Sequence, residues 1–237
     1  MNQEVTKMNE KIFLVDTNIL QILAEAINIG SAENLQRWHK TALTFFDRHG
    51  QNIRIPSIVW GEFLGLWFHK NVDMNMYDKW FQNRLSCYAQ TYKFLKCKKA
   101  AICDETGISY QKVMDMGIRF TSSQMPEGLI LTIAKRLEDA ITSLQAKCTY
   151  DPNDQKSKED LQRNEKNRKQ GKLLDGLDSI IVGFACEFAR TNANRQVVLV
   201  TRDRFIIDFL CFFSRDKNLL LSYGMPGNVT ASSPDRA

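Results

Sequence analysis

The sequence predicts an α/β fold with three layers, in which helices cover both faces of a central parallel sheet of about four to five strands. Two short apolar runs, at residues 12–15 and 197–200, are each followed by polar residues that include a carboxylate. An unbroken apolar run of this length is typical of a strand that is buried on both faces, as in a parallel sheet. Segments with the apolar spacing of helices lie between the strand candidates, and this alternation indicates a doubly wound sheet.

Length and composition suit one large domain, or one domain that carries an insertion. The chain has 237 residues, of which 43% are apolar, so a sizeable core is expected. Its balance of 32 basic against 27 acidic residues gives a net charge of +5. This mild excess is compatible with a nucleic-acid partner but does not by itself indicate one.

We expect a cytoplasmic protein with no membrane partner. No apolar stretch approaches the roughly 20 residues that span a bilayer, and residues 1–11 lack the apolar segment of a secretory signal. Six cysteines are scattered without a CxxC or a Cys/His spacing, which favours a reduced compartment and no zinc site.

In the first third of the chain, the elements after the first strand are expected in a regular order. Gly30 breaks the first helix, and Gly50 follows the second as a residue just beyond a helix end would. Ser57 can cap the third helix, whose otherwise apolar first turns contain Glu62. A carboxylate there costs free energy unless it faces a polar cleft or has a partner. The expected elements are helix 19–27, helix 32–49, strand 53–56 and helix 57–67.

The middle of the chain, residues 71–172, is expected to be a helical insertion. Its last part, residues 151–172, is polar and basic and is either a solvated helix or a mobile loop. The expected helices of the insertion are 74–99, 108–116 and 126–144. The elements expected after it are helix 179–190, strand 196–200, helix 205–213, strand 218–222 and a disordered tail over 223–237.

Four carboxylates fall where the predicted fold places its ligand cleft. Asp16 and Asp203 lie just beyond the carboxyl ends of strands, where open α/β sheets bind ligands. Glu62 and Asp178 lie early on helices that enter the same side. For Asp16 alone, capping of the following helix is an equally good explanation.

Together the four carboxylates predict metal chemistry. Converging carboxylates repel one another and need counter-charge. Mg²⁺ and Mn²⁺ favour carboxylate oxygens and water as ligands. An ion bound in this way can hold a substrate phosphate and lower the pKa of a water molecule. The pattern therefore indicates metal-dependent hydrolysis of phosphodiester bonds.

Four segments resemble the motifs of PIN-domain ribonucleases, in order and in local pattern. They are residues 14–20 (LVDTNIL), 55–64 (IPSIVWGEFL), 178–185 (DSIIVGFA) and 199–205 (LVTRDRF). The resemblance covers roughly residues 11–70 and 173–222, and so implies a PIN-like nuclease core built from residues 1–70 and 173–222. The long segment 71–172 is where this chain departs from the small toxins of the family, the VapC type.

Carried onto this sequence, the resemblance implies a metal-dependent endoribonuclease that uses Mg²⁺ or Mn²⁺. The catalytic and metal-binding residues would be Asp16, Glu62, Asp178 and Asp203. Asn18 and Thr201 would orient the ligands or the attacking water. Asp175 is either a further ligand or a cap of the helix that carries Asp178. The family also implies RNA as substrate, a toxin or defence role with an antitoxin or other regulatory protein as partner, and a homodimer.

Basic residues near the acidic group are candidates for contact with nucleic acid. Arg202 and Arg204 flank Asp203 and either neutralise substrate phosphate or form surface ion pairs. Arg168, Lys169 and Lys172 precede Asp175 and are expected to hang over the cleft. A second basic cluster in the insertion would track the RNA backbone, with Tyr92 or Phe94 stacking on bases, or else belongs to an ordinary helical cap; it contains Lys93, Lys96, Lys98 and Lys99. The histidines are assigned no catalytic role.

Two alternatives to the ribonuclease come from other functional classes. The first is a catalytically silent PIN-like module that binds RNA or a protein, although a pure scaffold has no reason to keep four repelling carboxylates. The second is a structure-specific DNA nuclease of the flap or 5′-nuclease type, although no helix-hairpin-helix element is evident. A haloacid-dehalogenase phosphatase would want an Asp-x-Asp pair where this chain has Asp16, Thr17 and Asn18.

Overall fold

The computed structural model confirms the predicted α/β fold with a parallel central sheet. It describes residues 10–65, 77–102, 107–119, 174 and 176–237. The sheet has five parallel strands in the order β3-β2-β1-β4-β5. In chain order the strands are β1 (Lys11–Val15), β2 (Ile53–Ile55), β3 (Ala101–Ile102), β4 (Gln196–Val200) and β5 (Val229–Ser232).

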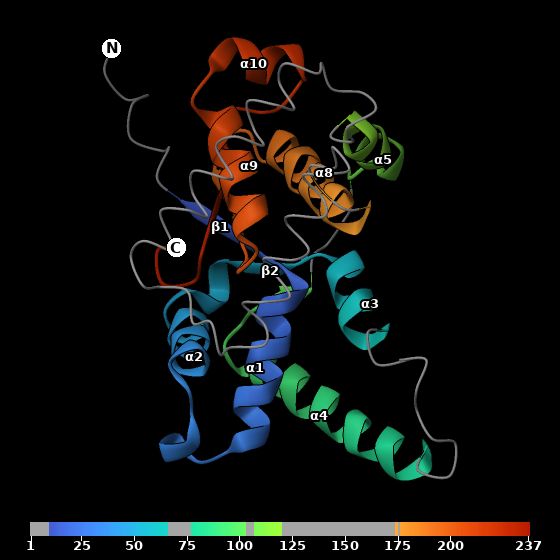
Figure 1. Ribbon diagram of the computed structural model, residues 1–237, viewed down its shortest axis with the longest axis vertical. Coiled ribbons are helices and arrows are strands. Elements are labelled where there is room, and N and C mark those ends of the chain that lie inside the picture. The colour runs from blue at the N-terminus through green and yellow to red at the C-terminus, as the bar shows by residue number, and fades with distance from the viewer. Residues whose placement is uncertain (1–9, 66–76, 103–106, 120–173, 175) are drawn as a thin grey trace, which may run out of the picture.

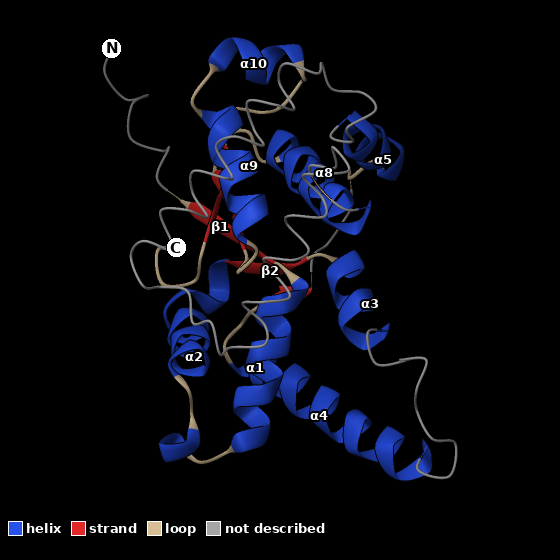
Figure 2. Ribbon diagram, in the orientation of Figure 1, coloured by secondary structure: helices blue, strands red, loops and turns tan. Residues whose placement is uncertain are grey.

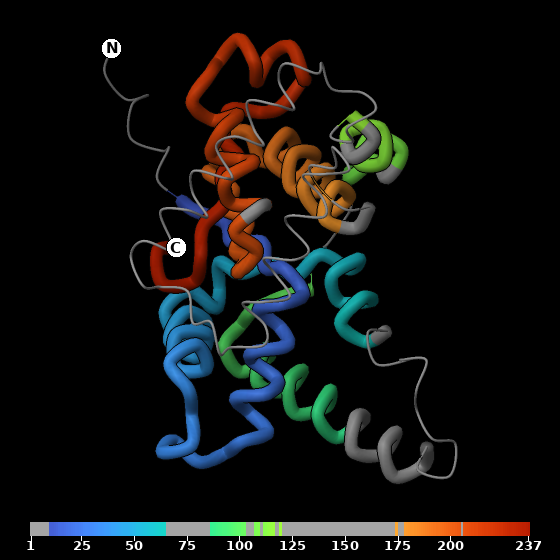
Figure 3. The backbone as a smooth tube through the Cα atoms, viewed as in Figure 1, coloured from blue at the N-terminus to red at the C-terminus, as the bar shows by residue number. Residues whose placement is uncertain are grey.

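Helices cover both faces of the sheet, as Figures 1 and 2 show. On one side lie α1 (Thr17–Ile29), α2 (Arg37–His49), α3 (Ser57–Gly65) and α4 (Tyr77–Cys97). On the other side lie α5 (Tyr110–Arg119), α8 (Gly176–Thr191), α9 (Arg204–Ser214) and α10 (Lys217–Ser222). Two short 3₁₀ helices, η1 (Ala32–Asn34) and η2 (Gly50–Asn52), flank α2. The backbone tube in Figure 3 shows the same two groups of helices as coils.

The centre of the sheet is the most deeply buried part of the molecule. β1 pairs with β2 on one side and with β4 on the other, and Leu14 and Val15 are fully buried. Leu199 and Val200 of β4 are equally inaccessible. This explains why both strands are apolar without alternation, since helices pack against each face. Among the described residues, no helix combines the length and the apolarity that a membrane crossing would need.

Two glycines fix the path of the chain around α2. Gly30 ends α1 as predicted, with a φ of 68° that glycine adopts readily. Gly50 differs from the prediction, because it has a right-handed φ of −43° and begins η2. A Cβ atom at Gly50 would lie 1.9 Å from the carbonyl oxygen of Lys98. Gly50 is therefore required by a close approach between two segments, and not by a left-handed helix end.

Described parts of the expected insertion, within residues 77–102 and 107–119, contribute to the central sheet and to its core. β3 is a strand of the central sheet, and the side chains of Leu95, Val113 and Met116 lie in the same apolar core as β1. Sequence pattern did not reveal this because β3 has only two residues, both exposed, so no apolar run marks it. The expected helix 126–144 and the polar segment 151–172 lie outside the described residues.

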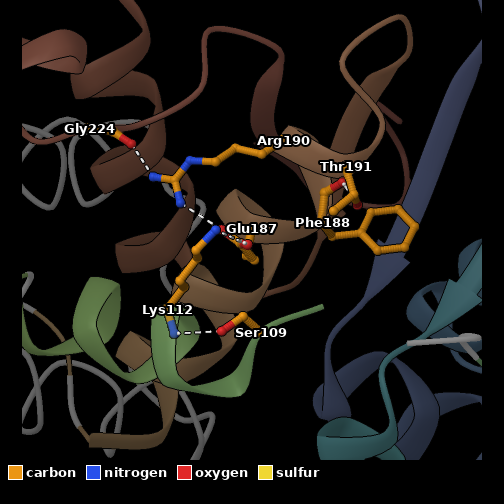
Figure 4. Close-up of polar contacts among 7 residues, drawn as sticks. All are labelled: Ser109, Lys112, Glu187, Phe188, Arg190, Thr191 and Gly224. Carbon is orange, nitrogen blue, oxygen red and sulfur yellow. Dashed lines mark hydrogen bonds and ion pairs between the residues drawn. The ribbon is translucent and has the colours of Figure 1, made fainter. Parts of the chain in front are cut away.

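The buried carboxylate of Glu187 links α8 to α5, as Figure 4 shows. Glu187 of α8 is 3% exposed and pairs with Arg190 at 2.6 Å. Lys112 of α5 lies 3.8 Å from the other oxygen of the same carboxylate. Arg190 also donates to the carbonyl oxygen of Gly224. Because one buried carboxylate serves two helices and a loop, α5 is tied to the core by polar contacts as well as by packing.

The C-terminal region corrects two expectations. Residues 218–222 form helix α10 and not a strand, because Asp216 caps it by accepting hydrogen bonds from two backbone N–H groups. The expected disordered tail over 223–237 is instead ordered around β5, which pairs with β4. Only Val229 and Ala231 of β5 are apolar and buried, and this is too short a pattern to identify from sequence. Asn228 anchors the strand by donating to three backbone carbonyls.

Candidate active site

Asp16 stands where β1 ends and α1 begins. Its Oδ1 accepts a hydrogen bond from the backbone N–H of Thr17 at 2.7 Å, so it caps α1. Its own N–H donates to the carbonyl oxygen of Val200 at the end of β4. The residue is only 4% exposed. Asp16 thus caps a helix and also occupies the carboxyl edge of the sheet, so the two interpretations of this residue are compatible.

Asn18, in the first turn of α1, and Thr201, just after β4, both bind Asp16. The Thr201 hydroxyl donates to Asp16 Oδ2 at 2.6 Å, and the Asn18 amide donates to the same oxygen at 2.6 Å. Asn18 also donates to Thr201 Oγ1 at 3.0 Å. Together with the contact from the Thr17 backbone, both oxygens of the Asp16 carboxyl group therefore accept hydrogen bonds. Its orientation is fixed by residues that lie more than 180 positions apart in sequence.

The loop after β4 is ordered by the same two residues. The backbone N–H of Asp203 donates to Thr201 Oγ1 at 2.9 Å. The backbone N–H of Arg202 donates to Asn18 Oδ1 at 3.1 Å. These contacts fix the turn that carries the half-buried Asp203 next to the Asp16 group. The structure therefore brings together four of the residues proposed from sequence, namely Asp16, Asn18, Thr201 and Asp203.

Thr17 joins Glu62 to this group, and the sequence analysis did not select it as a site residue. Its hydroxyl donates to Oε2 of Glu62, which lies half-buried on α3. Thr17 itself is 4% exposed. The signal in the sequence was a hydroxyl residue directly after the aspartate at a buried strand end, where a polar side chain needs a partner.

Burial and charge raise the pKa of Asp16 to about 6. Loss of solvation is the largest cause, and the negative charges of Glu62 and Asp203 raise the pKa further. The hydrogen bonds from Thr201 and from the Thr17 backbone act in the opposite direction. Asp16 is therefore a carboxylate that titrates close to neutral pH, a property that is common at functional sites.

Of the two other acidic candidates, Asp178 and Asp175, the structure describes Asp178. Asp178 lies half-buried in the first turn of α8. Asp175 lies outside the described residues, so its two interpretations stay as predicted.

The basic residues proposed to contact nucleic acid have different surroundings. Arg204 forms an ion pair with Asp208 at 3.0 Å, which favours the surface-pair interpretation. The guanidinium of Arg202 lies over the ring of Trp38, 5.7 Å from its centroid. Arg168, Lys169 and Lys172 lie outside the described residues.

The cluster near α4 contains both packed and exposed side chains. Lys98 pairs with Asp47 at 2.6 Å and lies over the ring of Phe94, so its charge is used within the fold. Phe94 packs against Phe46 of α2. Tyr92 is 51% exposed. The interpretation of Phe94 as a core residue is therefore favoured over a role in stacking on bases.

The donor set suits a hard divalent cation bound with water. A carboxylate offers about four lone pairs, and Asp16 uses three of them for Thr17, Asn18 and Thr201. Counting the contacts of the described residues, one position on Oδ1 is left for an ion. Mg²⁺ is usually bound through one or two carboxylates and retains several waters. Within the part of the chain that the structure describes, no three or more His, Cys, Asp or Glu side chains are grouped so as to hold a metal ion directly.

Comparisons with known protein families, with curated proteins and with solved structures find no match to this chain. The resemblance to PIN-domain ribonucleases thus stays a prediction from the four sequence segments.

Proposed function

We propose that this protein is a metal-dependent endoribonuclease that hydrolyses RNA phosphodiester bonds at the group formed by Asp16, Glu62 and Asp203. The observation that carries the proposal is the placement of Asp16. It is buried at the shared carboxyl edge of β1 and β4 and held by Thr201 and Asn18. Ligands of open α/β sheets bind at this edge.

The free-energy cost of ionising the buried Asp16 favours a functional role for this residue over a purely structural one. A pKa raised from 3.8 to about 6 means that ionised Asp16 costs the folded state about 3 kcal/mol at neutral pH. A helix cap does not need this cost, because Ser or Asn caps equally well without a charge. A divalent cation beside Asp16 would offset the cost, since it compensates the carboxylate charges that face one another.

The chain's own residues have separable roles in this proposal. Thr201 and Asn18 keep the carboxylate of Asp16 in one orientation, so that the free position of Oδ1 points to the same place in each molecule. Glu62 and Asp203, both half-buried, are the carboxylates that would take up a proton at an oxygen atom during hydrolysis. Asp178 would extend the acidic group from α8.

Mg²⁺ or Mn²⁺, when bound, would neutralise charge on the substrate phosphate and acidify water for attack on phosphorus. The proposed ligand is Asp16, with Glu62 and Asp203 binding directly or through water. An antitoxin or regulatory partner and a homodimer stay predictions from the sequence resemblance.

Cleavage of an RNA pool tests the proposal. The full chain is incubated with mixed single-stranded and structured RNA, and in parallel with DNA, in the presence of Mn²⁺, Mg²⁺ or EDTA. The test variant is Asp16→Asn/Asp203→Asn. The matched control is Glu33→Gln/Asp115→Asn, which removes the same two charges at exposed positions. Circular dichroism establishes that each variant is folded.

We expect RNA cleavage that needs the metal, persists in the control and is lost in the test variant. Failure to cut RNA or DNA with either metal would overturn the proposal in favour of a binding module. Cleavage of DNA alone would point instead to the flap-type nuclease.

A further inference from the structure

A cavity of about 440 Å³ lies between α2 and the segment that follows β5. In Figure 1 this C-terminal segment runs beside α2. The polar and charged residues of the lining on which the argument depends are Arg37, Lys40, Thr41, Thr44, Arg48 and Asp235. The proposed cleavage chemistry uses none of these side chains.

The basic side chains of the cavity form a row along one helix. Arg37, Lys40 and Arg48, with Thr44 between the last two, follow the three- and four-residue spacing that keeps side chains on the same face of a helix. Arg37 and Arg48 are separated by about 16 Å along the axis, from the rise of a helix per residue. Charges spread over this distance suit an extended polyanion better than one small anion, which would need them to converge on a point.

The charge of the cavity is available for a ligand. Arg37, Lys40 and Arg48 are exposed, and none of them forms an ion pair with another described residue. Among the described residues of the lining, Asp235 is the one acidic residue. A hydrogen bond from Ser233 lowers the pKa of Asp235, so this carboxylate is ionised at neutral pH. Three cations against one anion leave a positive surface that is also lined by the hydroxyls of two threonines.

One end of the row adjoins the candidate active site. Trp38, next to Arg37, is 43% exposed and lies under the guanidinium of Arg202. The backbone N–H of Arg202 in turn donates to Asn18, which holds Asp16. An exposed aromatic ring beside a basic row is the combination that binds single-stranded nucleic acid, because bases stack on the ring while cations contact phosphates.

We propose that the cavity along α2 is a phosphodiester-backbone subsite, which binds the strand on one side of the bond to be cut. In this arrangement Arg37, Lys40 and Arg48 contact successive phosphates, and Trp38 stacks on a base near the acidic group. That the strand is RNA rests on the proposed function; the subsite itself rests on the cavity and its charges.

Equilibrium binding in EDTA tests the subsite without any cleavage. Fluorescence anisotropy is recorded with a labelled RNA of about 20 nucleotides, long enough to cover the row and the acidic group together, and with DNA of the same sequence, over a series of salt concentrations. The test variant is Arg37→Gln/Lys40→Gln/Arg48→Gln. The matched control, Arg119→Gln/Arg215→Gln/Lys217→Gln, removes three exposed cations from α5 and from the α9–α10 region, on the other side of the sheet. A further variant, Asp235→Asn, removes the one anion from the lining.

We expect the test variant to bind RNA roughly 10- to 100-fold more weakly at about 0.1 M salt, with a salt slope lower by about 2, since each phosphate contact on a single strand contributes about 0.7. The control should stay within about 3-fold of the wild type, and Asp235→Asn should bind more tightly. The DNA arm shows whether the subsite distinguishes the two backbones, and loss of binding to either supports it.

The subsite is overturned if the wild type binds neither strand, if the two triple variants lose the same affinity, or if Asp235→Asn does not tighten binding. If the wild type cuts RNA but the test variant binds it normally, only the subsite fails. If binding follows our expectation and no metal supports cleavage, only the proposed function fails.

Discussion

Replacing Asp16 by asparagine should change how the stability of the protein depends on pH. The carboxyl group has a pKa of about 6 in the folded chain and the ordinary value of 3.8 in the unfolded chain. Between these values the folded state binds more protons than the unfolded state, so the free energy of unfolding falls as pH rises. The stability that this group contributes is therefore present below about pH 4 and lost as pH passes through 6.

The size of the effect follows from the shift. The full difference corresponds to about 3 kcal/mol, and roughly 2 kcal/mol of it falls between about pH 4 and pH 7.5. The asparagine variant has no charge to desolvate at this position, so its free energy of unfolding lacks this component. Some of the gain at neutral pH will be offset, because an amide nitrogen placed at Oδ2 cannot accept the hydrogen bonds from Thr201 and Asn18.

Urea unfolding at several pH values measures the effect. Relative to the wild type, Asp16→Asn should become more stable by roughly 2 kcal/mol between about pH 4 and pH 7.5. The exposed Glu33→Gln serves as a matched control, and its curve should run parallel to that of the wild type. If the Asp16→Asn curve is also parallel to the wild type, Asp16 does not titrate near neutral pH, and the reasoning about its buried charge is refuted.

Three further substitutions test other contacts, each by urea unfolding. Thr201→Val should lower the free energy of unfolding by about 2 to 3 kcal/mol, because it removes the hydrogen bond to the buried Asp16 and leaves the backbone N–H of Asp203 without its acceptor. Thr201→Ser should retain most of the stability, and equal losses in the two variants would contradict this reasoning. Gly50→Ala should lower the free energy of unfolding by about 2 kcal/mol or more, because its Cβ would clash with the carbonyl oxygen of Lys98. Gly61→Ala, on the open face of α3, should raise it by about 0.5 kcal/mol. Similar effects of the two substitutions would show that the backbone near Lys98 shifts to make room for the Cβ. Arg190→Gln should cost about 2 kcal/mol by leaving the buried Glu187 with Lys112 as a distant partner. A loss under about 0.5 kcal/mol would contradict the role of Arg190 as the close partner of this buried carboxylate.

The sequence predicted the central strands because burial on both faces leaves a strong pattern. The unbroken apolar runs before Asp16 and Thr201 are typical of strands that are buried on both faces. Their parallel pairing places Asp16 and Thr201 at the same edge of the sheet. The peripheral strands left no such pattern. β3 has two exposed residues and β5 has two buried ones, so backbone pairing, which the side chains do not encode, decides their structure.

Local chemistry also overrode pattern at several positions. The short unbroken run of three leucines in α10 was expected to be a strand, but leucine is also a good helix former, and the cap by Asp216 stabilises a helix. Gly50 follows a helix and was expected to end it, while the structural reason for glycine is a contact with Lys98, which lies far along the chain. The hydrogen bond from Thr17 to Glu62 needs the relative position of α1 and α3, which no local pattern contains.

Binding of Mn²⁺ to the wild type and to Asp16→Asn, measured by titration calorimetry at about pH 6 and about pH 7.5, tests the central claim most directly. We predict that the wild type binds Mn²⁺ more tightly at the higher pH, because the ion needs ionised Asp16, and that it releases about half a proton per ion at about pH 6. Asp16→Asn should lose most of this binding, while Glu33→Gln should retain it. Equal Mn²⁺ affinity in the wild type and in Asp16→Asn would contradict the claim that Asp16 is the centre of a metal-dependent nuclease site.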